Sequence, residues 1–275
     1  MTKNNYLVTG SEGFVGFNLS NYIKKLGHNV FGVDFNDGRD NLWETLISDN
    51  YKTDSTKKRN DLRADKLKLL FKKYNYEINQ NKINDSINWI SKRCTQDHNA
   101  GIDKPTEIRI NEIFSYLKID LENGNLKKDV LNELDKSFLS SPPKLFKSTK
   151  KILKKLKNNY HICLTSNTGI TSPETYKIYL NNLGIKDIFD KIYLSNELMV
   201  AKPSSLIFRK ISNDFKLKAN QIVHVGDNLF TDIFGAKKIG MKTVYINKRK
   251  SVTNNLNFSS DYTVRDISEL LNIFT

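Results

Sequence analysis

Hydrophobic and polar positions follow two periods in the second half of the chain. Beyond residue 147, short apolar runs of strand length alternate with longer segments in which apolar residues recur every three or four positions. Apolar strands separated by amphipathic helices are typical of a parallel sheet with helices on both faces. We therefore predict an α/β fold built on a Rossmann-like parallel sheet. The expected strands are YHICLTS (160–166), KIYLS (191–195), QIVHVGD (221–227) and KTVYI (242–246).

The first 44 residues show the same two periods in one smaller unit. An apolar run, NYLVTG (5–10), precedes a segment with helical spacing (14–27), and a second apolar run, NVFGVD (29–34), follows. We predict that residues 1–44 form a Rossmann-like βαβ segment that contributes to the core sheet. Residues 29–34 are expected as a central parallel strand, with residues 5–9 beside it.

The pattern changes between residues 45 and 141, where helical spacing dominates and strand signals are few. The segment SSPPKLF (140–146) marks the end of this region, because paired prolines cannot continue a helix. We therefore expect an α-helical cap over residues 45–141, inserted before a core that occupies residues 142–275.

Composition and charge change this picture little. The chain has 275 residues and a net charge of +14, but its lysines fall on polar helix faces, as in residues 148–159. Since no strip combines aromatic and basic residues, we expect a solvated surface and no nucleic-acid partner. No apolar run approaches the roughly 20 residues that span a bilayer. A signal peptide is also missing, so we expect a cytoplasmic protein without a membrane partner.

Polar residues stand where the predicted strands end. Ser166 and Asn167 lie at the end of one strand, and Asp227 ends another, with Asp232 one turn into the next helix. In open α/β sheets, the carboxyl ends of the strands line the functional crevice. These residues are therefore expected to share one site.

A lysine completes this set of residues. Lys202 directly precedes Pro203, which we expect at the first position of a helix. Lys202 can neutralise a phosphoryl group, to which Ser166 can donate a hydrogen bond. The set suits a phosphate, with Asn167 as a further phosphate contact, and a magnesium ion.

The acidic residues are the candidate ligands of that ion. Asp227 can ligate Mg²⁺, which takes few carboxylates and several waters. Asp232 can ligate the same ion or anchor Lys202 and the loop, and the sequence leaves both roles open.

Two segments, residues 164–211 and 222–246, resemble the haloacid dehalogenase-like hydrolase superfamily. The resemblance covers roughly residues 142–248, with the motifs in the family's order, and the helical region lies where capped members carry their cap. It implies a Mg²⁺-dependent hydrolase, most often a phosphatase that acts on a small phosphorylated metabolite through an aspartyl-phosphate.

The family's first motif is Asp-x-Asp-x-Thr after an apolar strand, and Asp34 is placed to be its nucleophile and a metal ligand. Asn36 and Gly38 then occupy the places of the second Asp and of the Thr. A shifted alignment makes Asp37 the nucleophile and puts Arg39 in the acid/base place. Both alignments stay open.

The segment over residues 5–34 resembles the start of extended short-chain dehydrogenases and nucleotide-sugar epimerases. Gly10, Gly13 and Gly16 form a G-x-x-G-x-x-G turn, and Asp34 stands where a ribose ligand is expected. The catalytic Tyr-x-x-x-Lys of that family does not occur in the sequence.

Three hypotheses follow from these patterns. The leading hypothesis is a Mg²⁺-dependent phosphatase of the haloacid dehalogenase-like class. The second is a binding protein that keeps the fold but has lost catalysis with its first motif. The third is an NAD- or nucleotide-sugar-binding module based on residues 5–34.

Overall fold

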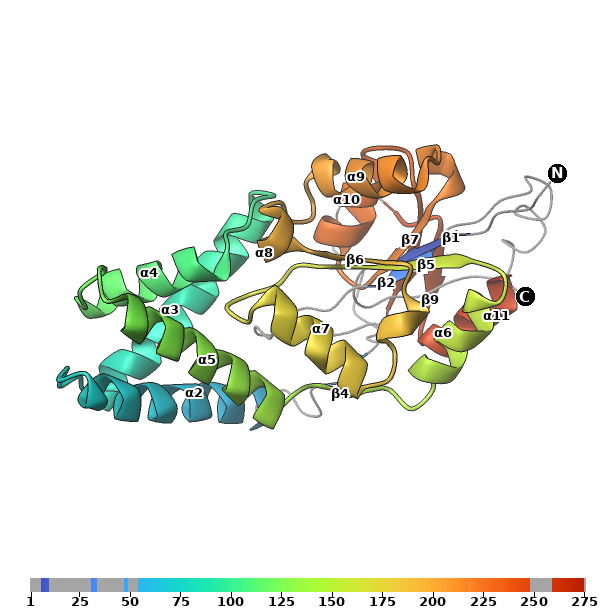
Figure 1. Ribbon diagram of the computed structural model, residues 1–275. Helices are drawn as coiled ribbons and strands as arrows, with labels where there is room; N and C mark the ends of the chain where they lie inside the picture. Colours follow the sequence, from blue (N-terminus) through green and yellow to red (C-terminus); the bar gives the residue numbers. More distant parts are fainter. Residues whose placement is uncertain (1–5, 10–30, 34–46, 49–53, 248–258, 275) are drawn as a thin grey trace.

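The computed structural model describes residues 6–9, 31–33, 47–48, 54–247 and 259–274, with side chains from residue 59 onward. Within these ranges the chain forms a parallel sheet with helices on both faces and a helical bundle to one side (Figure 1). The predicted fold class is therefore confirmed. None of the described helices is both long and apolar enough to cross a membrane.

The main sheet consists of parallel strands in the order β6-β5-β2-β1-β7-β8-β9. All the strands expected in the second half of the sequence are present. In chain order the strands are β1 (Tyr6–Thr9), β2 (Phe31–Val33), β5 (His161–Ser166), β6 (Lys191–Leu194), β7 (Val223–Gly226), β8 (Lys242–Ile246) and β9 (Tyr262–Val264).

The two N-terminal strands occupy the middle of this sheet, between β5 and β7. Leu7 and Phe31 are both in register with Ile162, and β1 also pairs with β7. Strand β6 pairs with one edge of β5, so β1 and β2 both pair with the opposite edge of β5. The prediction that residues 29–34 give a central parallel strand is thus confirmed for Phe31–Val33.

The alternation of side chains along each strand divides the core between the two faces of the sheet. On β5, Ile162 and Leu164 pack into one hydrophobic cluster, whereas Cys163 packs into the other. The first cluster lies under α6 (Thr149–Lys157), α7 (Pro173–Asn182) and α11 (Leu271–Phe274), and the second under α9 (Ser205–Phe215) and α10 (Gly235–Lys237).

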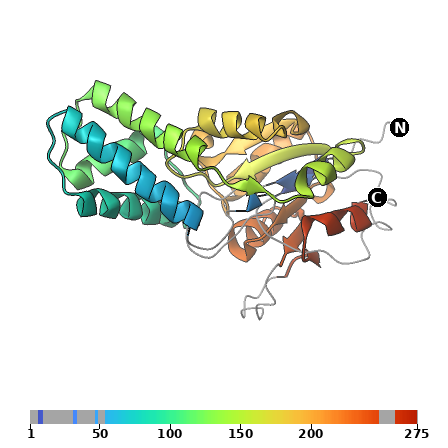
Figure 2. The ribbon, with the colours of Figure 1, turned by 90° about the horizontal axis from the view of Figure 1, so that it is seen from below.

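The helical region is a bundle with its own core, seen beside the sheet in both ribbon views (Figures 1 and 2). Side-chain oxygens of Asn79 and Asn123 cap two of its helices by accepting from backbone N–H groups. Where the bundle joins the sheet, β3 (Ile47–Ser48) pairs antiparallel with β4 (Lys144–Leu145). The bundle helices are α2 (Asp54–Lys73), α3 (Gln80–Asn99), α4 (Thr106–Leu117) and α5 (Gly124–Ser140).

The bundle also packs against the sheet at the end of β5. Ile170, in the loop after that strand, is buried within the hydrophobic cluster of the bundle. The bundle therefore lies next to the strand ends at which polar residues were predicted.

Close packing at Gly235 gives a first prediction. A Cβ atom there would lie 2.7 Å from Cε2 of Phe208 and 2.9 Å from the backbone Cα of Pro203. We expect Gly235→Ala to lower the free energy of unfolding by about 1–3 kcal/mol in urea titrations, because the helix must move away from Pro203. Gly124→Ala is the matched control, since a Cβ at Gly124 meets nothing within 4 Å. An equal effect of the two substitutions would contradict this account.

Candidate functional site

The structure brings the polar strand-end residues together at one edge of the sheet. Ser166 is the last residue of β5, and Asp227 directly follows β7. Lys202 lies in the loop between α8 (Ser195–Leu198) and α9. All three side chains are buried, and Ser166 and Lys202 have no exposed surface. Solvent therefore screens their charges and dipoles weakly.

An ion pair between Lys202 and Asp232 fixes the lysine. The Nζ atom of Lys202 lies 2.8 Å from Oδ1 of Asp232, and both side chains are fully buried. Nε2 of His224 lies 3.3 Å from the same oxygen, and the backbone N–H of Asn228 donates to Oδ2 at 3.0 Å. Protein groups thus contact both oxygens of Asp232, as an anchoring role requires, and its role as a metal ligand stays a prediction.

The attraction between Lys202 and Asp232 opposes the desolvation cost of burying the two charges. Burial alone would raise the pKa of Asp232, but the attraction of Lys202 outweighs it and holds that pKa below its ordinary value. Burial lowers the pKa of Lys202, against the attraction of Asp232 and Asp227. The 2.8 Å contact and the lowered pKa of Asp232 indicate an ionised pair.

Asn167 holds the backbone of the lysine loop. Its Nδ2 donates to the carbonyl oxygen of Lys202 at 2.9 Å, and its Oδ1 accepts from the N–H of Lys202 at 2.9 Å. Both ends of the amide are therefore used within the protein, and the role of Asn167 as a phosphate contact stays a prediction. The expected helix start was wrong: α9 begins at Ser205 with Ser204 as its N-cap, so Pro203 lies just before the helix.

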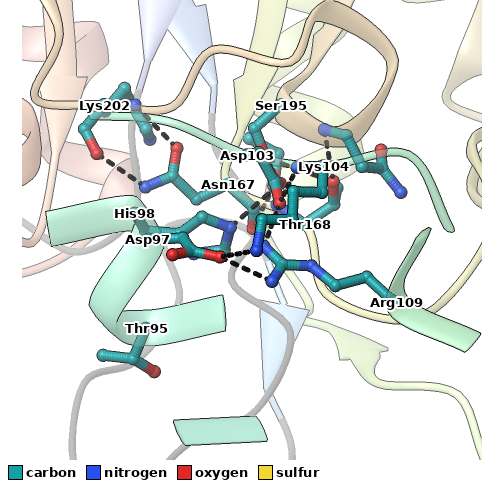
Figure 3. Close-up of polar contacts among 12 residues, drawn as sticks. Thr95, Asp97, His98, Asp103, Lys104, Arg109, Asn167, Thr168, Ser195 and Lys202 are labelled. Atoms are coloured by element: carbon teal, nitrogen blue, oxygen red, sulfur yellow. Dashed lines mark hydrogen bonds and ion pairs between the residues drawn. The ribbon is translucent and has the colours of Figure 1, made fainter. Parts of the chain in front are cut away.

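Three further residues, which the sequence analysis did not identify, connect this edge to the bundle. The N–H of Thr168 donates to Oγ of Ser195 at 2.7 Å, and Ser195 donates to Oδ2 of Asp103 at 2.5 Å (Figure 3). Ser195 directly follows β6, so its position at a strand end was a signal available in the sequence. Asp103 lies in the α3–α4 loop of the bundle, and no periodic pattern marks it.

Asp103 belongs to a charged cluster that the bundle buries. Arg109 has no exposed surface, and its guanidinium donates to Asp103 at 2.8 Å and to Asp97 at 2.6 Å. Nε2 of His98 lies 2.9 Å from Oδ2 of Asp103, and Glu112 also pairs with Arg109, at 3.1 Å. Asp97, His98, Asp103 and Arg109 lie close to Ser195 and Thr168 in the close-up (Figure 3).

The described residues fit a divalent cation near Asp227. Lys202 supplies one positive charge, whereas Asp227 and Asp232 supply two negative charges in the same buried region. Mg²⁺ is bound through one or two carboxylates and several waters, so Asp227 suits it as a direct ligand. No cluster of three His, Cys, Asp or Glu side chains able to hold a metal occurs within the described part of the chain.

The other predicted site residues lie outside the described residues. Gly10, Gly13 and Gly16 follow β1, which ends at Thr9. The resemblance to dehydrogenases and epimerases that depends on these glycines therefore stays a prediction.

Asp34 and Asp37 lie outside the described residues as well, and β2 ends at Val33. Val33 is in register with Leu164, two residues before Ser166. Asp34 is the next residue of the sequence.

A parallel sheet, a helical bundle beside the ends of its strands and a buried lysine–aspartate pair define the class of this α/β protein. The family model for haloacid dehalogenase-like hydrolases matches residues 59–246, well over half of the chain. The chain belongs to this family. The match begins after the segment that contains Asp34 and Asp37.

Two curated relatives are phosphatases. Glyceraldehyde 3-phosphate phosphatase from Pyrococcus furiosus is 34% identical over 93 residues, which cover 33% of this chain and 39% of that enzyme. The chain thus aligns with about two fifths of that relative's length. Human N-acylneuraminate-9-phosphatase is 27% identical over 209 residues, which cover 74% of this chain and 82% of the enzyme.

A solved structure supports the fold. The HAD-hydrolase YfnB from Bacillus subtilis, in a form bound to magnesium, superposes with a TM-score of 0.56 at 18% identity. The superposition covers 88% of this chain and 96% of that protein.

Acid should destabilise the protein through the buried carboxylates of the bundle. Burial would raise the pKa of Asp103 and of Asp97, but hydrogen bonds from His98 and Arg109 respectively outweigh it and lower each pKa below the ordinary 3.8. The unfolded chain then binds these protons first, so the stabilisation is complete above the unfolded pKa and is lost below it. We expect the free energy of unfolding to fall from pH about 4 to pH about 2 in urea titrations. Asp103→Asn should make this fall shallower; an unchanged slope would contradict the assignment.

Proposed function

We propose that the protein is a Mg²⁺-dependent phosphatase that hydrolyses a small phosphate ester through an aspartyl-phosphate on Asp34. The observation that carries this proposal is the burial of Lys202, paired with Asp232, with Ser166 and Asp227 buried at the carboxyl ends of β5 and β7. A fixed cation and a hydroxyl donor in a buried site suit a phosphoryl group.

The chemistry divides into two displacements at phosphorus. The carboxylate of Asp34 attacks phosphorus, the oxygen–phosphorus bond of the ester breaks, and the alcohol leaves after it takes up a proton. Water then attacks the aspartyl-phosphate, which releases inorganic phosphate and regenerates the carboxylate. Lys202 and Ser166 bind the phosphoryl oxygens in both steps, and a bound Mg²⁺ would supply further neutralisation of their charge.

Three observations support Asp34 as the nucleophile. It follows an apolar strand in the sequence, and that strand, β2, runs parallel to β5 in the centre of the sheet. The register of Val33 with Leu164 brings β2 to within two residues of the level of Ser166. Asn36 cannot transfer a proton, so we propose that the proton for the leaving group comes from another group or from water.

The names of the relatives support a small phosphorylated metabolite as the substrate class. Glyceraldehyde 3-phosphate and an acylneuraminate 9-phosphate are both small, anionic phosphate esters. The bundle that packs beside the site is then the element that selects the organic part of the substrate.

Substitution of the two candidate nucleophiles tests this proposal. With Mg²⁺ and a panel of phosphorylated sugars, nucleotides and p-nitrophenyl phosphate, we expect turnover by the wild type and none after addition of EDTA. Asp34→Asn should lower kcat by about 10⁴-fold or more, because the nucleophile is lost. Asp37→Asn should have a milder effect. The control is Asp129→Asn in α5 of the bundle, where the carboxylate accepts from Tyr74 at 2.9 Å and contacts none of the predicted site residues in the described part of the chain.

Other outcomes would separate the remaining hypotheses. Loss of activity with Asp37→Asn but not with Asp34→Asn would make Asp37 the nucleophile. Binding of Mg²⁺ and phosphate by a wild type that turns nothing over would favour a binding protein that has lost catalysis, a reading motivated by Asn36 and Gly38. Binding of NAD(H) in equilibrium dialysis would favour the nucleotide-binding module, and no binding up to millimolar levels would exclude it.

A further inference from the structure

The α3–α4 loop of the bundle reaches both loops that carry the phosphate-binding residues. Its first connection is through side chains: Asp103 accepts from Ser195, and Ser195 accepts from the N–H of Thr168. Thr168 lies two residues after Ser166 and next to Asn167. The bundle is thus connected to the loop after β5 by two consecutive hydrogen bonds.

The second connection is through the backbone. The N–H of Ala201 donates to the carbonyl of Gly101 at 3.1 Å, and the N–H of Asp103 donates to the carbonyl of Met199 at 3.3 Å. Ile102 and Val200 form an antiparallel bridge between these two bonds. The α3–α4 loop is therefore a partner of the segment that leads directly into Lys202.

The buried charges around Asp103 carry a desolvation cost, so stability alone does not explain why the bundle contains them. Replacing buried ion pairs by well-packed apolar residues is often neutral or stabilising, so burial of Arg109 with Asp97 and Asp103 is weak evidence for a purely stabilising role. What the cluster does achieve is a fixed orientation of the Asp103 carboxylate. Oδ1 accepts from Arg109 and from the N–H of Lys104, which leaves Oδ2 to accept from Ser195 and His98.

Ser195 links the oriented carboxylate of Asp103 to the loop after β5. Its hydroxyl has one proton, which is donated to Asp103, so its lone pairs are directed at the N–H of Thr168. Oγ1 of Thr168 also lies 3.2 Å from Ser195 and accepts from the N–H of Asn196. The N–H and the hydroxyl of Thr168 are in this way held by groups outside the loop.

We propose that Asp103 and Ser195 are positioning residues that hold the phosphate-binding loop, residues 166–168, in its binding conformation from the helical bundle. This inference rests on the proposed function of the site, because the loop is taken to bind a phosphoryl group. A substrate that contacts the α3–α4 loop of the bundle would thereby act on the geometry of the phosphate contacts.

Ser195→Ala tests the connection, with Ser195→Thr as the conservative variant. The probes are inorganic phosphate, measured by calorimetry, and p-nitrophenyl phosphate, measured by turnover with Mg²⁺. Loss of the hydroxyl should weaken phosphate binding and raise KM by about tenfold, with a smaller change in kcat, because the loop is less ordered before it binds. Ser195→Thr should restore most of the affinity.

Ser86→Ala is the matched control for the loss of a buried hydroxyl. Ser86 is fully buried in α3, where it donates to the carbonyl of Ile83 at 2.7 Å. It precedes His98 by twelve residues, about 18 Å along the helix. We expect Ser86→Ala to alter stability without altering phosphate affinity.

A double-mutant cycle shows whether Asp103 acts through Ser195. Asp103→Ala and Ser195→Ala should each cost about tenfold in phosphate affinity, and the double variant should cost about the same rather than a hundredfold. A double variant that loses about a hundredfold in phosphate affinity, the product of the two single losses, would overturn the proposal. So would a Ser195→Ala variant that binds phosphate as tightly as Ser86→Ala does.

Amide hydrogen exchange separates this inference from the proposed function. Ser195→Ala should increase exchange in a peptide that contains Thr168, while exchange in the strands β7 and β8 stays unchanged. A wild type that neither binds phosphate nor turns over any ester would overturn the proposed function and this inference with it. Unchanged exchange at Thr168, with an active wild type, would overturn the inference alone.

Discussion

The buried ion pair between Lys202 and Asp232 is the constraint on which the rest of the site depends. Removing either partner would leave a buried charge without compensation, which typically costs about 3–5 kcal/mol. The pair is stable here because His224 and the N–H of Asn228 also approach the carboxylate. A buried cation with a fixed position is what a phosphate site needs.

The fold holds Lys202 at two points and the adjacent Pro203 at a third. Asp232 fixes the ammonium group, and the amide of Asn167 fixes the backbone through two hydrogen bonds. Gly235 allows the following turn to pack closely against Pro203. These contacts come from the loop after β5, from the helical turn Leu229–Phe234 and from α10, so the position of Lys202 depends on the packing of all three.

Much of this arrangement could be predicted from the sequence because it depends on local patterns. One strand with an apolar run ends at Ser166 and another ends just before Asp227, and parallel strands bring their carboxyl ends to one edge. The predicted start of α9 was wrong by two residues. Ser204 is the N-cap, because its hydroxyl oxygen accepts from the N–H of Leu206, and the helix therefore begins at Ser205 rather than at Pro203.

The connection of the bundle to the core could not be predicted in this way. Asp103 and Ser195 are 92 residues apart, and a single buried hydrogen bond between them leaves no periodic signal. The donors that contact each oxygen of Asp232 could not be predicted from the sequence either. Such contacts follow from tertiary packing rather than from residue spacing.

A crystal structure of the protein with Mg²⁺ and beryllium fluoride is the most direct test of the account. It predicts a beryllium fluoride group attached to the carboxylate of Asp34, within hydrogen-bond distance of Ser166 and Lys202. The Mg²⁺ ion should lie at about 2.1 Å from an oxygen of Asp227. If the Asp34 carboxylate lies beyond the reach of a metal ion shared with Asp227, or if the metal binds away from Asp227, the account is contradicted.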